Sequence, residues 1–184
     1  MITRALLVAG LAGVIALGVS PPPAGAVVPV AKPIGGCALL GTANAAKILG
    51  GPAAAIHETN HQMSFGLVRG CTYSGAGIEI PYTVTNYPNA AVAKQVVSSV
   101  SAKVQEPTSG LLLMGNGTPK IKGYPSLVYY FQLMPGEGEA PPPFDFLSET
   151  VVRKGSIVFV AEAATDDDST PMLRKVANIV VPRM

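Results

Sequence analysis

The N-terminal segment of this 184-residue chain constrains the fold most, because it decides the chemical environment in which the remainder folds. Arg4 precedes an apolar run from Ala5 to Val19, and the small residues of Ala24-Gly25-Ala26 suit a signal peptidase. This pattern predicts an export signal over residues 1–26 that is cleaved after Ala26. The apolar run is shorter than the roughly 20 residues that a transmembrane helix needs, and an uncleaved anchor is the alternative.

The mature chain contains two cysteines, Cys37 and Cys71. Outside the reducing cytosol such a pair most simply forms a structural disulfide. The segment from Ile34 to Cys37 loosely imitates the motif before the acylated cysteine of bacterial lipoproteins, but it lies far beyond the apolar run. Acylation of Cys37 would also leave Cys71 as an odd thiol. We therefore predict a Cys37–Cys71 disulfide and release of the chain after signal cleavage.

Charge and hydropathy exclude some classes of partner. The full chain has 13 basic and 11 acidic side chains, and Arg4 lies in the predicted signal, so the mature net charge is about +1. No basic cluster exceeds Lys120 and Lys122, which argues against nucleic acid and anionic membrane surfaces. No later stretch is apolar enough for a transmembrane segment. We expect a monomer whose partner is an envelope or extracellular protein or an apolar ligand.

The order of predicted elements indicates an α+β fold. After an extended Pro- and Gly-rich leader at 27–36, residues 37–184 are expected to form a single domain. Apolar periodicity and turn residues predict helices at 42–49, from the residue after Asn89 to Val104, and after 166–171, and strands at 67–74, 77–87, 127–133, 147–153 and 156–163. Because hairpins link the strands, we expect a mainly antiparallel sheet of about five strands packed with two to three helices.

Three segments of the mature chain resemble a known family. Cys37-Ala38-Leu39-Leu40, the helix ending Ile48-Leu49-Gly50, and Gly70-Cys71-Thr72-Tyr73 resemble the opening of a family of small exported proteins and lipoproteins of unknown function in mycobacteria and other actinobacteria. The likeness covers most of the mature chain, more loosely after Tyr87. It implies an envelope or extracellular setting and a structural pair of cysteines. It transfers no catalytic residue, because the family has no established chemistry.

The pentapeptide from His57 to His61 is spelled like a zinc-peptidase motif. In a helix, His57 and His61 would be zinc ligands one turn apart, and Glu58 would be the catalytic base that activates water. The extended motif needs a third ligand, but Ser64 and Leu67 occupy the positions where it is expected. We therefore predict an exposed turn or short helix without catalytic residue, metal or cofactor. A zinc metallopeptidase is the alternative.

Two other groups of residues deserve a functional interpretation. Tyr129 and Phe131 belong to a strand that is apolar on both faces, so we expect them in the core, and the lining of an apolar-ligand pocket is the alternative. The acidic run at 166–168 is expected to favour the start of a helix rather than to bind calcium. The sequence thus predicts a secreted or cell-wall-associated binding domain rather than an enzyme.

Overall fold

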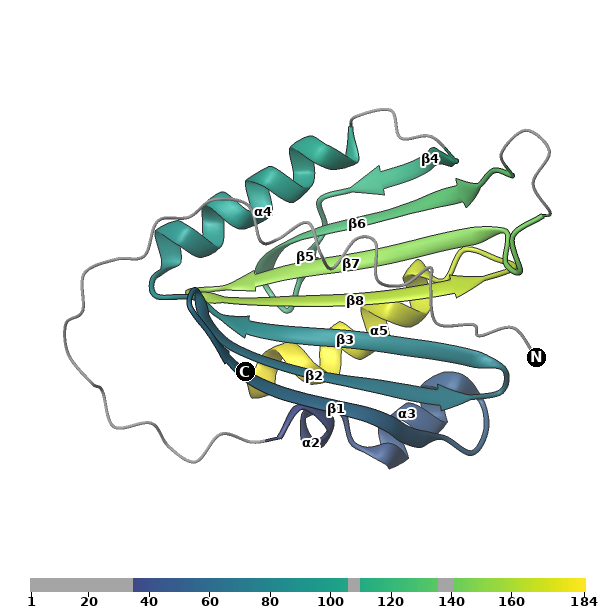
Figure 1. The fold of residues 1–184 in the computed structure, drawn as a ribbon, viewed down its shortest axis with the longest axis horizontal. Helices are drawn as coiled ribbons and strands as arrows, with labels where there is room; N and C mark the ends of the chain where they lie inside the picture. The colour runs from purple at the N-terminus through teal and green to yellow at the C-terminus, as the bar shows by residue number, and fades with distance from the viewer. Residues whose placement is uncertain (1–34, 106–109, 136–140) are drawn as a thin grey trace.

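The computed structural model describes residues 35–105, 110–135 and 141–184 (Figure 1). The predicted signal, its cleavage after Ala26 and most of the predicted leader lie outside these ranges. The helices are α2 (Gly36–Leu40), α3 (Thr42–Leu49), α4 (Ala90–Val104), α5 (Thr170–Val180) and the 3₁₀ helix η2 (Val181–Arg183). None of the helices in the described ranges is long and apolar enough to cross a membrane.

The strands form one antiparallel sheet in the order β1-β2-β3-β8-β7-β6-β4, and β5 pairs with β6. Their bounds are β1 (Ala54–Met63), β2 (Gly66–Gly75), β3 (Ile78–Asn86), β4 (Leu111–Gly117), β5 (Lys120–Ile121), β6 (Tyr124–Leu133), β7 (Phe146–Lys154) and β8 (Ile157–Thr165). The predicted α+β class and antiparallel pairing hold. The β2–β3 and β7–β8 hairpins were both predicted, and each turns at a glycine with positive φ, Gly77 and Gly155.

The predicted number of about five strands is wrong, because the described residues form eight. The prediction lacked β1, β4 and β5. The β1 segment carries polar residues on both faces and β4 alternates weakly, so neither has the one-sided apolar pattern that marks a half-buried strand. Both are edge strands, which pair with a neighbour on one side only. Four α-helices are described instead of two to three, since the prediction also lacked α2.

The sheet carries a hydrophobic core on each face. Adjacent residues of β7 alternate between the two: Val152 packs in the cluster with α2, α3 and α5, and Val151 in the cluster with α4. Such alternation follows from the pleat of a strand, which directs successive side chains to opposite faces. α4 therefore covers one face, called the α4 face below, and the other three helices cover the opposite face (Figure 1). Helix α4 begins after Asn89, as predicted, and the Asn89 side chain caps it by accepting from the Val92 N–H at 3.0 Å.

Candidate functional site

The zinc-motif pentapeptide lies on β1, in a strand rather than in the predicted turn or short helix. Its backbone pairs with β2 in a hairpin that turns at Ser64 and Phe65, and the polar sequence of β1 gives no sign of this pairing. A strand places His57 and His61 on one face, but with Cα atoms about 13 Å apart instead of the roughly 6 Å between neighbours one helical turn apart. β1 thus lacks the geometry that the zinc alternative requires. Nowhere in the described ranges do three His, Cys, Asp or Glu side chains form a group that could hold a metal ion.

Glu58, the catalytic base of the zinc alternative, contacts the start of α2 instead. The Cys37 N–H donates to Glu58 Oε1 at 2.9 Å, so the carboxylate satisfies a backbone donor that has no partner inside the helix. Glu58 lies opposite Cys71 in the β1–β2 ladder, which places its side chain beside the disulfide. The hydrogen bond gives Glu58 a structural role, which explains an acidic residue at this position without a catalytic function.

The effect of removing this contact can be predicted. Glu58→Ala leaves the Cys37 N–H without its acceptor and should lower the free energy of unfolding by roughly 1 kcal/mol. Glu58→Gln keeps an amide oxygen at the same place and should retain most of that stability. Chemical denaturation of the two variants and the wild type measures both values. Equal stability of Glu58→Ala and the wild type would contradict the capping role.

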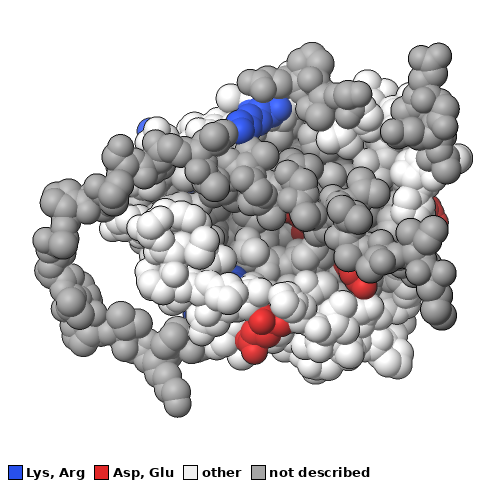
Figure 2. Space-filling model, viewed as in Figure 1, with Lys and Arg blue, Asp and Glu red and all other residues white. Residues whose placement is uncertain are grey.

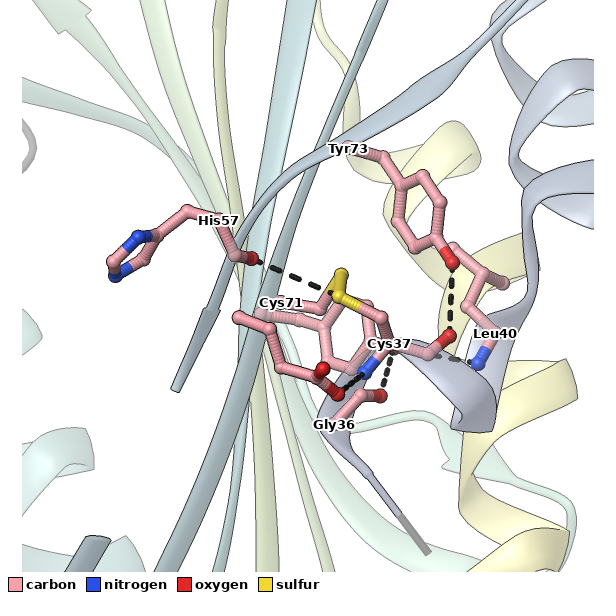
Figure 3. Close-up of a disulfide and its surroundings, with 8 residues drawn as sticks. Gly36, Cys37, Leu40, His57, Cys71 and Tyr73 are labelled. Carbon is pink, nitrogen blue, oxygen red and sulfur yellow. Dashed lines mark hydrogen bonds between the residues drawn. A yellow bond between two sulfur atoms is a disulfide. The ribbon is translucent and has the colours of Figure 1, made fainter. Parts of the chain in front are cut away.

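The predicted disulfide joins Cys37 to Cys71, with 4.9 Å between their Cα atoms (Figure 3). It fastens α2 to β2, and two buried phenols add to this attachment. Tyr73 donates to the Cys37 carbonyl oxygen at 2.8 Å, and Tyr82 donates to the Gly36 carbonyl oxygen at 2.6 Å. Burial raises the pKa of both phenols, so they remain protonated donors. Gly36 must be glycine, because an added Cβ would collide with the backbone of β2.

A row of polar side chains crosses the α4 face in the middle of the sheet. Asn116 on β4 lies opposite Tyr129 on β6, Tyr129 lies opposite Glu149 on β7, and Glu149 lies opposite Glu162 on β8. Residues directly opposite in an antiparallel pair share a face and have Cβ atoms about 5 Å apart. We call these four residues the polar row. Glu149 is only 6% exposed, so the row brings a carboxyl group into the core.

The two carboxyl groups of the polar row hold their protons unusually tightly. Burial and, to a smaller extent, the neighbouring Glu162 together raise the pKa of Glu149 to about 8, although a hydrogen bond from Tyr129 acts in the opposite direction. Burial likewise raises the pKa of Glu162 to about 7. Tyr129 is 2% exposed, and burial together with the charge of Glu149 raises the pKa of its phenol. Titratable groups with strongly shifted pKa values concentrate at functional sites, so the polar row is a candidate site.

A small cavity of about 90 Å³ borders the polar row at Asn116 and Tyr129. Its other walls come from β4, β6 and the C-terminal end of α4: Ser101, Val104, Gln105, Gly117, Thr118, Leu127 and Val128. Tyr129 therefore lines a cavity, as the apolar-ligand alternative required. Phe131 does not line it, because its ring packs edge-on against Tyr129 in the core at a centroid distance of 5.5 Å.

Sequence reasoning missed Glu149 and Glu162. A signal for both was present, since each glutamate interrupts an alternating apolar face: Leu147 and Val151 flank Glu149, and Val160 precedes Glu162 at the same spacing. A charged residue at a core position of a strand is uncommon and indicates a paired or functional group. The pairing of the two glutamates depends on the β7–β8 register, which the hairpin around Gly155 defines.

Comparison with known proteins provides a fold but no family. No family model and no curated protein sequence matches this chain at a significant level. The crystal structure of the extracellular domain of PknH from Mycobacterium tuberculosis is similar, with a TM-score of 0.59 and 10% sequence identity, over 79% of this chain and 92% of that domain. At this identity the likeness shows the fold alone. The resemblance to the actinobacterial family thus gains a mycobacterial structural neighbour and no support at the level of sequence.

Proposed function

We propose that this chain is an exported, non-enzymatic domain that binds a protein partner in the cell envelope or the extracellular space. Three observations support the export: the signal-like N-terminal segment, the Cys37–Cys71 disulfide, and a fold that is shared with an extracellular domain. Disulfides persist in oxidising compartments and are rare in the cytosol. The proposal does not depend on any catalytic group.

An exposed apolar patch on the β4 edge of the sheet carries the proposal. Leu112 is 50% exposed, Met114 is 46% exposed and Met134, just after β6, is 47% exposed. The half-buried rings of Tyr130 and Phe146 pack against each other on the same face as Leu112, with 6.2 Å between their centroids. We call these five residues the β4 patch. Clustered apolar side chains beside unpaired strand edges are typical of sites that add a strand or an apolar surface from a partner.

In the described part of the chain, the size of the cavity beside Tyr129 favours a protein partner over a small apolar ligand. Pockets for small molecules usually enclose roughly 300–1,000 Å³. The cavity beside Tyr129 measures about 90 Å³, too small for a lipid or another large apolar molecule. Charged side chains are also sparse on the surface shown in Figure 2, as expected of a chain with only 13% charged residues. A protein partner can use such a surface without a deep pocket.

Site-specific crosslinking tests this proposal. A photoreactive phenylalanine derivative at Leu112 should yield one defined protein adduct in the culture of the producing cell. The matched control places the same group at Ile56, which is 53% exposed on the opposite edge strand β1. Substitution of Met114 by lysine should weaken capture at position 112 about tenfold, because a charge on an edge strand opposes both apolar contact and strand addition. Identical adducts from both positions, or none from position 112, would refute the role of the β4 patch.

A further inference from the structure

We propose that two copies of this chain associate through β1, and that their histidines then form two sites for a transition-metal ion such as zinc. The two β1 strands run antiparallel about a two-fold axis at Thr59, so that His57 of each copy lies opposite His61 of the other. This dimer differs from the monomer expected from the sequence. It uses the edge of the sheet that lies opposite the β4 patch.

The outer edge of β1 lacks most of the features that prevent a further strand from adding. β1 is ten residues long, nine of them exposed, and in the described part of the chain it pairs only with β2. Edge strands are normally short, or carry lysine, proline, bulges or inward-pointing charges. β1 contains neither lysine nor proline, and its carboxylate, Glu58, is held at the start of α2. Its bulge lies at one end, between Ala55 and His57, which leaves the rest of the strand regular.

The backbone at this edge limits the registers that a second copy can adopt. Hydrogen-bonded and non-hydrogen-bonded pairs alternate in an antiparallel ladder, and the pair that closes a two-residue turn, here Met63 and Gly66, is hydrogen-bonded. Thr59 has the same parity as Met63, so its N–H and C=O groups point to β2, and those of Glu58 and Asn60 point outward. Even-numbered residues of the two copies must therefore pair with each other, which places the two-fold axis at a residue.

The charge of Glu58 selects one register. An axis at Glu58 or at Thr59 pairs nine of the ten residues of β1 with nine of the second copy, since both positions lie beside the centre of the strand. An axis at Glu58 would oppose the two Glu58 carboxylates, and like charges directly opposite destabilise a sheet. An axis at Thr59 places Glu58 opposite Asn60 instead. The segment from His57 to His61 is thus self-complementary about its central threonine.

Thr59 suits the position on the axis. It lies opposite Gly70 on β2, where an added Cβ would collide with Thr59 Oγ1. The Thr59 side chain therefore lies over the glycine and does not obstruct a second strand. Two threonines directly opposite each other are also among the cross-strand pairs that stabilise antiparallel sheets.

The register brings together histidines that are apart in one chain. His57 and His61 of the same copy have Cα atoms about 13 Å apart. Opposite each other in a non-hydrogen-bonded pair, a His57 and a His61 from different copies have Cα atoms about 4.5 Å apart. Because Zn–N bonds are about 2.0–2.1 Å long, two imidazole rings at this separation can bind one ion. The His57 ring already points away from the disulfide (Figure 3). Association therefore creates two metal sites that a single copy lacks.

Sedimentation equilibrium of the purified protein, with zinc chloride or with a chelator, tests the proposal. The dissociation constant of the dimer should be about tenfold lower with zinc, because an ion that binds only the dimer shifts the equilibrium toward it. His57→Asn and His61→Asn should each abolish this zinc effect, since every site needs one histidine of each kind. Glu79→Gln removes an exposed carboxylate on β3 and should retain the effect.

Three results would overturn the proposal. The first is a protein that stays monomeric with zinc, and the second is a dimer whose dissociation constant does not respond to zinc. The third is an asparagine variant that dimerises with zinc as the wild type does.

Cysteine crosslinking tests the register. Only the residue on the axis meets its own counterpart, so Thr59→Cys should form an intermolecular disulfide on mild oxidation, at a Cα separation of about 4.5 Å that a disulfide can span. Asn60→Cys faces Glu58 of the second copy and should not crosslink. Crosslinking of Asn60→Cys but not of Thr59→Cys would refute the register. A photoreactive group at Ile56 should capture a second copy, an adduct distinct from the partner at Leu112, so the proposed function can be judged separately.

Discussion

Joint replacement of Cys37 and Cys71 by serine is expected to lower the free energy of unfolding by about 4 kcal/mol. The disulfide closes a loop with a sequence separation of 34 residues, and the loss of this constraint on the unfolded chain accounts for that value in the chain-entropy model. For a domain of this size the melting temperature should fall by roughly 10 °C. Thermal unfolding followed by circular dichroism measures the change.

The location of the effect can be tested as well as its size. The disulfide holds α2 against β2, so the amide protons of Gly36–Leu40 should exchange faster in the double variant than those of β7 and β8. Thr72→Ser, next to Cys71 on the same strand, is the matched control and should change stability by less than about 1 kcal/mol. A double variant as stable as this control would show that the hydrogen bonds of Tyr73 and Tyr82 suffice to hold α2.

Glu149→Gln is expected to stabilise the protein at alkaline pH and to leave it almost unchanged near pH 5. The folded protein raises the pKa of Glu149 to about 8 from an ordinary value of 4.5, so the native state binds this proton more tightly than the unfolded state does. The resulting stability is fully present below about pH 4.5 and is lost as the pH rises through about 8. The glutamine is always neutral, and the gain at about pH 9 should be on the order of 3 kcal/mol.

Melting temperatures measured between about pH 5 and about pH 9 test this prediction. The wild type should lose stability across this range, and the Glu149→Gln profile should be flatter. Glu162→Gln should have a similar but smaller effect, because the pKa of Glu162 is raised less, to about 7. Glu79→Gln changes an exposed glutamate and should follow the wild type. Parallel profiles for Glu149→Gln and the wild type would mean that Glu149 is ionised in the folded protein without cost.

Local patterns were sufficient to predict much of the fold. The four-residue recurrence of valines from Val92 to Val104 marks α4, and the turn residues around Gly77 and Gly155 mark the two hairpins. These features depend on contacts between residues close in the chain, where side-chain spacing and backbone freedom act directly. β1 and β4 are edge strands that pair with one neighbour each, β2 and β6, and none of their side chains is buried. Their sequences therefore carry little of the apolar alternation that identifies a strand.

For the candidate site, the difference between what the sequence predicts and what the tertiary structure decides is larger than for the fold. By itself the sequence determined the disulfide partners, since an exported chain with two cysteines has one way to pair them, and it determined the α+β class. Only the tertiary structure decided that Glu58 of the zinc-like pentapeptide caps α2, and that Glu149, Glu162 and Tyr129 meet on one face. The physical reason is register: backbone hydrogen bonds between neighbouring strands place particular side chains opposite one another, and the spacing of residues along one strand does not encode which residues of the next strand they meet.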